Sequence, residues 1–127
     1  MSRGQLAAVR REGGGLPARR YISARTRGAL QLIPVTDIAY FKAEQKYVTV
    51  RYREGEVLIE DSLKTLEEEF GEYFARIHRN SLVHVASIAS LEKNPAGNCL
   101  VCLRGMEDKL EVSRRHVAEL RRRLLAG

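Results

Sequence analysis

Alternation of apolar and polar residues runs through the first half of the chain and predicts β-strands. Strands are expected over residues 29–35, 38–44, 46–53 and 56–60. The alternation is clearest in KYVTVRYR, where Val48, Val50 and Tyr52 would share one face and Thr49 and Arg51 the other. The short polar connection over residues 43–46 predicts a hairpin turn or a bulge.

The pattern changes to a helical period in DSLKTLEEEFG, residues 61–71. Either Asp61 or Ser62 would cap the first turn of this short helix, and Gly71 would end it. Its apolar stripe consists of Leu63, Leu66 and Phe70.

The second half of the chain returns to β character and ends in a second helix. Strands are expected within residues 73–85, where polar residues interrupt the pattern, and over residues 87–93, 99–105 and 109–112. Turns are expected at residues 95–98 and 105–108. Ser113 would cap the final helix, whose apolar face consists of Val117, Leu120 and Leu124. The whole pattern predicts a mostly β protein with two helices.

Positive charge is concentrated at the two ends of the chain. The 127 residues suit one domain with a modest core, and they have a formal net charge of +6 and an isoelectric point near 9.7. Residues 1–20 and 113–127 each contain five arginines and one glutamate, whereas residues 54–72 contain eight acidic residues and one lysine. This balance favours a polyanion bound to one side of the molecule. The alternative is a solvated acidic helix beside unrelated basic ends.

Residues 1–20 are predicted to form a flexible basic linker or arm ahead of a domain over residues 21–127. The segment lacks apolar periodicity and contains Gly13, Gly14, Gly15 and Pro17. Such an arm could touch phosphates, but an inert tether between domains is favoured because nothing fixes its geometry.

Cys99 and Cys102 have the C-x-x-C spacing of redox and zinc sites. They lie in a predicted strand, where residues three apart point to opposite faces and cannot share one metal ion or one disulfide. We therefore expect buried, reduced thiols in a cytoplasmic protein.

Sequence motifs of common enzyme sites are missing from the chain. G-x-S-x-G, a P-loop and H-E-x-x-H are absent, and His78, His84 and His116 do not have the spacing of a metal site. No apolar run approaches the roughly 20 residues that cross a bilayer, and residues 1–15 lack the apolar core of a signal peptide. We expect a soluble, cytoplasmic protein without a catalytic, metal or cofactor site and without a membrane partner.

A polar cluster interrupts the apolar pattern of FARIHRNSLVHV, residues 74–85. Its side chains donate hydrogen bonds that suit phosphates and base edges, and they are Arg76, His78, Arg79 and Asn80. The cluster predicts a nucleic-acid reader built on strands.

The basic final helix is the alternative reader. A helix-turn-helix requires a partner helix a few residues upstream, whereas a strand immediately precedes this one. The helix is therefore expected to brace the sheet. Only Arg114 and Arg115 remain contact candidates, because the positive end of the helix would add to their attraction for phosphate.

Four segments of the chain form a pattern that is typical of a known family. In chain order they are IPVTDIAYFKAEQKYVTV, SLKTLEEEF, FARIHRNSLVHVASI and LEVSRRHVAELRRRL. Together they resemble the LytTR family of DNA-binding domains, most closely the AlgR-type response regulators that control bacterial transcription. The resemblance covers residues 21–125 and implies an elongated, mostly β fold of packed sheets, with about ten short strands, a short mid-chain helix and a C-terminal helix. It also implies loops and strand ends that enter successive major grooves of DNA.

The resemblance places three DNA-contacting regions on this chain. They are the turn Glu44, Gln45, Lys46 and Tyr47, the turn His78, Arg79 and Asn80, and the segment Ser113, Arg114 and Arg115. Lys46 would lead the first region. In the second, Arg79 would read guanine and Asn80 would serve adenine or a phosphate. In the third, Arg115 would contact a base and Arg114 a phosphate.

Three of the candidate contact residues, among them Arg76 of the polar cluster, have structural alternatives. Lys46 could be a solvated hairpin lysine, and Arg76 could fix the loop through a carboxylate instead of contacting DNA. His78 could satisfy a backbone carbonyl at the end of a strand.

The resemblance implies sequence-specific binding of double-stranded DNA for transcription regulation, often by a homodimer on paired direct repeats. Family members usually carry an N-terminal receiver domain that is phosphorylated on aspartate. No receiver sequence occurs in residues 1–127, and the basic arm resembles the tether that would follow one. The chain would then be either part of a longer regulator or a single-domain relative.

A basic β domain that binds RNA or single strands without sequence preference is the competing prediction. Exposed aromatic side chains would stack on bases, and the candidates are Tyr40, Phe41, Tyr47 and Tyr52. Their alternation with valine favours a place in the core for most of them.

Overall fold

The computed structural model describes residues 18–126, so most of the predicted arm, residues 1–17, lies outside the described part. Ten strands, two α-helices and two short 3-10 helices, Val35–Asp37 and Val85–Ser87, make up the regular structure of the described part. The strands are β2 (Tyr21–Thr26), β3 (Ala29–Pro34), β4 (Ile38–Glu44), β5 (Tyr47–Tyr52), β6 (Gly55–Ile59), β7 (Phe74–His78), β8 (Ser81–His84), β9 (Ile88–Lys93), β10 (Cys99–Leu103) and β11 (Lys109–Val112). The α-helices are α1 (Leu63–Phe70) and α2 (Arg114–Ala126).

An antiparallel five-stranded sheet, in the order β6-β5-β4-β8-β7, forms the centre of the molecule. Its middle strand β4 begins with Ile-Ala-Tyr-Phe, residues 38–41, and all four side chains are buried. Because adjacent residues of a strand point to opposite faces, both faces of this sheet must be covered. Thr49 on β5, which was expected on a polar face, is also buried.

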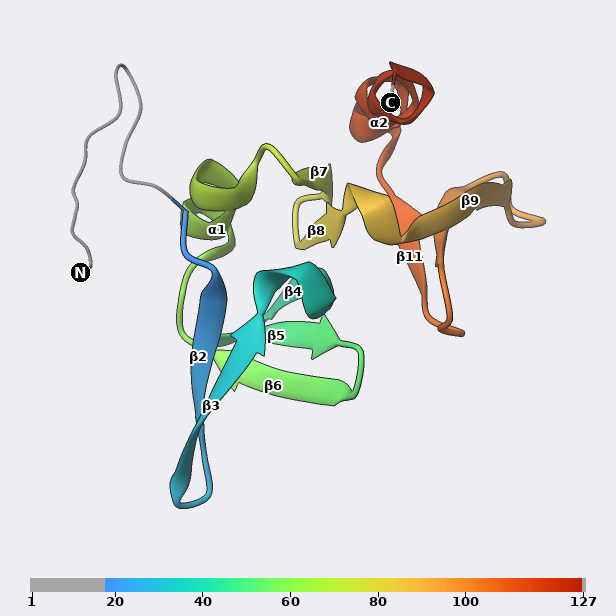
Figure 1. The fold of residues 1–127 in the computed structure, drawn as a ribbon. Helices are drawn as coiled ribbons and strands as arrows, with labels where there is room; N and C mark the ends of the chain where they lie inside the picture. The colour runs from blue at the N-terminus through green and yellow to red at the C-terminus, as the bar shows by residue number, and fades with distance from the viewer. Residues whose placement is uncertain (1–17, 127) are drawn as a thin grey trace, which may run out of the picture.

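Two hydrophobic cores lie on the two faces of this sheet. The first is shared with the β2–β3 hairpin and α1, and it contains the rings of Phe41, Phe70 and Phe74 with centroids 5.2 to 6.2 Å apart. The second is shared with the three-stranded sheet β11-β10-β9 and with α2, whose Leu120 is 1% exposed. Figure 1 shows the hairpin and α1 on one side of the central sheet, and β9 to β11 with α2 on the other.

Helix α1 begins and ends where the sequence predicts. Ser62, one of the two predicted caps, accepts a hydrogen bond of 3.0 Å from the backbone N–H of Thr65 through its hydroxyl. Gly71 ends the helix without a left-handed conformation. A Cβ at that position would lie 2.8 Å from the carbonyl oxygen of Glu67, so the chain needs glycine there for space.

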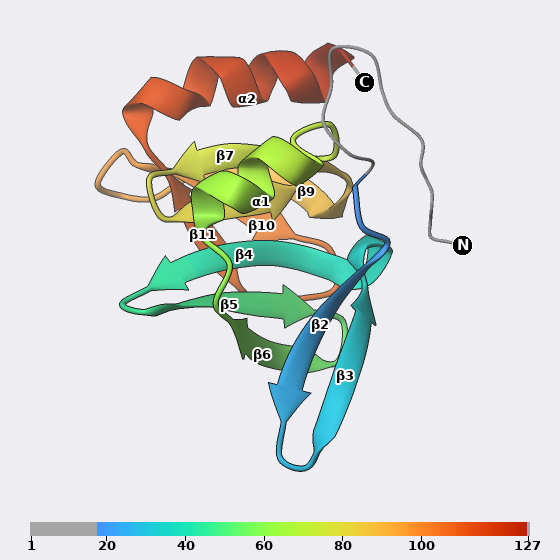
Figure 2. The same cartoon turned by 90° about the vertical axis from the view of Figure 1, so that its left-hand side faces the viewer.

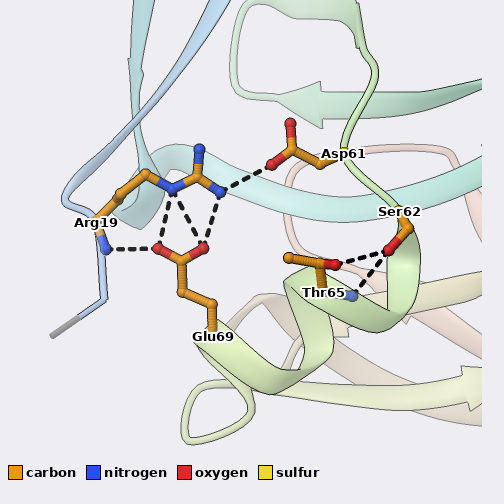
Figure 3. A network of polar contacts seen from close by, with 5 residues as sticks. All are labelled: Arg19, Asp61, Ser62, Thr65 and Glu69. Atoms are coloured by element: carbon orange, nitrogen blue, oxygen red, sulfur yellow. Dashed lines mark hydrogen bonds and ion pairs between the residues drawn. The ribbon is translucent and has the colours of Figure 1, made fainter. Parts of the chain in front are cut away.

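The segment that enters the domain is attached to α1 by Arg19. Its guanidinium contacts the carboxylates of Glu69 at 2.8 Å and Asp61 at 3.0 Å, as Figure 3 shows. The hydrogen bonds that Arg19 donates to Glu69, opposed by partial burial and reinforced by Asp61, raise the pKa of Arg19 above its usual value. The carbonyl of Arg20 also accepts from the N–H of Val35 at 2.9 Å. The last residues assigned to the arm therefore lie against the domain.

The mostly β fold with two helices is confirmed, and β2 is the one strand that the sequence pattern does not predict. It pairs with β3 along its full length, from Tyr21 opposite Pro34 to Thr26 opposite Ala29. Only Ile22 and Ala24 of β2 are buried, so its apolar alternation is too short to be recognised by itself.

The two cysteines lie on β10 and are free. Cys99 packs against the second core, whereas Cys102, three residues on, lies beside Glu92 on the other face, which confirms the predicted opposition. Both side chains are half-buried, not fully buried as expected. Within residues 18–126, no helix is long and apolar enough to cross a membrane.

Candidate nucleic-acid interface

The turn between β4 and β5 presents the first group of predicted contact residues. Glu44 pairs with Tyr47 across the hairpin, which leaves Gln45 and Lys46 as the turn residues. Gln45 has a φ of 54° and is the one non-glycine residue with a positive φ in the described part of the chain. Backbone strain of this kind is concentrated at functional sites. All four side chains are exposed, and Leu58 of β6 joins them around a cavity of about 210 Å³.

In the turn between β7 and β8, Arg76 is held by its neighbours. Its Nη1 donates to the carbonyl of Arg79 at 2.7 Å, and its Nε donates to a carboxylate oxygen of Glu67 at 3.2 Å. Its Nη2 lies 3.0 Å from the same oxygen and completes an ion pair. The predicted alternative for Arg76, a loop-fixing contact with a carboxylate, is therefore confirmed. The side chain of Arg79 itself is exposed to solvent.

The other residues of the β7–β8 turn are bonded to the backbone and to each other. Nδ1 of His78 accepts a long hydrogen bond, 3.4 Å, from the N–H of Asn80, whereas a backbone carbonyl was the expected structural partner. The side-chain oxygen of Asn80 accepts from the Ser81 hydroxyl at 2.8 Å. The carbonyl of Asn80 accepts from the N–H of Ala43 at 2.9 Å, which joins this turn to the end of β4.

The first turn of α2 lies beside the end of β7. The N–H of Ser113 donates to the carbonyl of Ile77 at 2.8 Å, and Arg114 and Arg115 are exposed. The Ser113 hydroxyl bonds to Nδ1 of His116, a side-chain contact in place of the predicted cap on a backbone N–H. Burial, together with the positive charges of Arg115 and Arg76, lowers the pKa of His116.

One open cavity of about 540 Å³ joins the second and third predicted regions. It is lined by Glu67, Arg76, His78, Arg79, Ser113, Arg115 and His116. Asn80 and Arg114 are not among the lining residues. Glu67 and His116 were not predicted for this site. Nothing in the sequence distinguishes Glu67 from the adjacent glutamates, because its contact arises only when α1 packs on β7.

All three predicted regions lie along one side of the molecule. Figure 2 shows the β4–β5 turn, the β7–β8 turn and the start of α2 on its left-hand side, with α2 uppermost. The bonds from Ala43 to Asn80 and from Ser113 to Ile77 connect these segments through the backbone. The spacing of the three regions is therefore set by backbone hydrogen bonds between them and not by flexible loops.

Basic side chains without a carboxylate partner gather on this side. None of the ion pairs among residues 18–126 includes Lys46, Arg79, Arg114 or Arg115. Elsewhere on α2, Arg122 pairs with Glu119, and Arg123 donates to the carbonyls of Phe74 and Glu72. Arg123 therefore braces α2 against β7, whereas Arg114 and Arg115 of the first turn are exposed and, within residues 18–126, unpaired.

Aromatic side chains contribute little to this surface. Tyr40 and Phe41 are 6% and 0% exposed, and Tyr52 packs against the first core. Tyr47 is 43% exposed, which makes it the one of the four candidate aromatics that lies open to solvent.

Comparison with known proteins identifies the family. The family model described as "LytTr DNA-binding domain" matches residues 28–125. The chain is 49% identical over 124 residues to the positive alginate biosynthesis regulatory protein of Pseudomonas aeruginosa, a match that covers 95% of this chain and 50% of that protein. The chain thus spans about half the length of this relative.

A solved structure has the same fold. It is the LytTr DNA-binding domain of a putative methyl-accepting/DNA response regulator from Bacillus cereus, with a TM-score of 0.75 and 21% identity. The alignment covers 87% of this chain and 100% of that one. From the matched family model, which spans most of the chain, it follows that the chain belongs to the LytTr DNA-binding domain family.

Proposed function

We propose that this chain binds double-stranded DNA with sequence preference and regulates transcription. The β4–β5 turn, the β7–β8 turn and the first turn of α2 would enter successive major grooves. The observation that carries the proposal is the gathering of unpaired cations from three separate segments along one side of a rigid sheet. Polyanion binding needs this charge, and base reading needs side chains held at fixed positions.

The exposed residues suit three kinds of contact. Arg79 and Arg115 line one cavity and have the paired donors that match the O6 and N7 atoms of guanine. Lys46 and Arg114, as exposed cations, are assigned to phosphates. Gln45, Tyr47, His78 and Asn80 complete the proposed surface.

The similarity to the regulatory protein of Pseudomonas aeruginosa supports a role as the output domain of a response regulator in a two-component system. Binding as a homodimer on paired direct repeats and control by a receiver domain are part of this proposal. A cytoplasmic location follows from the same role. The proposal includes no enzymatic activity.

Selection from a random-sequence duplex library, followed by competition, tests the function. The chain should enrich a common sequence, and that duplex should compete better than its scrambled version at every salt concentration tested. Equal competition by the scrambled duplex, or by single-stranded DNA or RNA of the same length, would refute the proposal. Non-specific stacking on single strands is disfavoured because Tyr40 and Phe41 are buried.

A further inference from the structure

We propose that Glu67 is a positioning residue for DNA recognition: through Arg76 it holds the β7–β8 turn in the conformation that presents Arg79. This inference rests on the proposed function and assigns a role to a carboxylate that does not itself touch DNA. It also removes Arg76 from the DNA-contacting set and makes it the connection between α1 and the turn.

Three nitrogen atoms of Arg76 are used by this connection. Nε donates to Glu67 at 3.2 Å, Nη2 lies 3.0 Å from the same carboxylate oxygen in an ion pair, and Nη1 donates to the carbonyl of Arg79 at 2.7 Å. The Arg76 side chain is 21% exposed, so little of it is open to a phosphate. One planar guanidinium therefore links a rigid helix to the backbone of the residue assigned to base reading.

The carboxylate fixes the orientation of the guanidinium. Without Glu67, Arg76 would lose the partner of two of its nitrogens and would be free to turn toward a DNA phosphate. The carbonyl of Arg79 would then lose its side-chain donor. The turn would keep its strand pairing, since the Asn80 to Ala43 bond does not involve Arg76, but the direction of the Arg79 side chain would no longer be fixed.

Simple electrostatics predicts the opposite result. Glu67 is a negative charge in a cavity lined by three arginines, so its removal should strengthen the binding of any duplex if charge were its whole effect. A positioning role predicts weaker binding of the selected duplex and equal or stronger binding of scrambled DNA. The ratio of these two affinities separates the explanations.

Helix α1 offers a matched series of substitutions in consecutive glutamates. Glu67→Ala removes the partner of Arg76, Glu68→Ala removes an exposed carboxylate, and Glu69→Ala removes the partner of Arg19. Each variant loses one negative charge, and alanine favours the helix. The selected duplex from the library experiment and its scrambled version serve as probes in a fluorescence anisotropy titration.

For Glu67→Ala, we expect the ratio of affinities for the selected and scrambled duplexes to fall at least about fivefold, the lower end of the discrimination that one base contact supplies. Glu68→Ala and Glu69→Ala should leave the ratio unchanged. A Glu67→Ala variant with an unchanged ratio would overturn the inference. An equal fall in Glu69→Ala would also overturn it, because the cause would then be a general loosening of α1.

Two further measurements keep the inference testable if Glu67→Ala folds poorly. Arg76→Lys keeps the charge but not the fork that reaches both partners, so it should lower the affinity ratio in the same way. In the DNA-free protein, amide hydrogen exchange at Arg79 and Asn80 should accelerate in Glu67→Ala and not in Glu68→Ala. If the wild-type chain enriches no sequence, the proposed function fails, whereas the exchange comparison still tests the brace.

Discussion

Gln45 occupies a backbone conformation that favours glycine, so Gln45→Gly should stabilise the fold while it weakens DNA binding. The φ of 54° costs an L-residue about 1–2 kcal/mol, because its Cβ approaches the following carbonyl oxygen. Glycine removes this cost but loses about 0.5–1 kcal/mol more conformational free energy on folding. The midpoints of these two ranges differ by about 0.75 kcal/mol, which is the predicted gain in the free energy of unfolding.

Urea denaturation followed by circular dichroism measures this gain. For a domain of this size, it corresponds to a rise in Tm of about 3–6 °C. Lys46→Gly is the control, because Lys46 shares the turn but has no positive φ, and this variant should lose stability. If Gln45→Gly unfolded at a lower urea concentration than the wild type, or if both variants were equally stabilised, the strain argument would be refuted. The affinity of Gln45→Gly for the selected duplex should fall, since the proposed contact side chain is gone.

Three other predictions concern single side chains. Arg79→Ala should cost about 1–3 kcal/mol of DNA-binding free energy and relax the preference at one base position, whereas Arg122→Ala should weaken binding slightly and evenly. Competition with duplexes that carry single-base changes measures both effects. A larger loss for Arg122→Ala would show that α2 reads the DNA. Arg19→Gln should lower the free energy of unfolding by no more than about 1 kcal/mol, because the Arg19 side chain is 42% exposed and its ion pairs are screened by solvent. An unchanged urea denaturation curve would show that the contact of Arg19 with α1 does not persist in solution. Burial lowers the pKa of His84 in the folded protein. The stability that the neutral imidazole contributes is therefore complete above the pKa of histidine in the unfolded chain, about 6.5, and is lost as pH falls through the folded pKa. Between pH of about 7.5 and 5.5 the wild type should therefore lose more stability than His84→Gln, and equal losses would contradict the assignment.

The elements that the sequence predicts well are those with a complete local pattern. Val48, Val50 and Tyr52 alternate along β5, and Ser62 precedes a helical stripe that ends before Gly71. Each of these patterns lies within about ten residues and is readable without a partner. Strand β2 lacks such a pattern because the β2–β3 hairpin buries only Ile22 and Ala24 of its residues.

The environments of individual side chains are less predictable. Thr49 is buried although the sequence pattern places it on a polar face, because the pairing of β5 with β4 and β6 sets Lys42 and Leu58 directly beside it. Ser113 bonds to the ring of His116 instead of a backbone N–H, a choice between two local partners that the capping pattern does not resolve.

The sequence by itself determined the order of strands and helices from β3 onward, membership of the family and the three short segments proposed to contact DNA. Only the tertiary structure decided which arginines are available. Arg76 and Arg79 are three residues apart and equally basic, but the packing of α1 on β7 gives Arg76 the carboxylate of Glu67 and leaves Arg79 exposed. The pairing of β4 with β8 and the contact of β11 with β7 likewise bring the three segments to one side. The physical reason is that strand and helix patterns repeat over neighbouring residues, whereas charge pairing depends on residues that meet only when the sheets and helices pack.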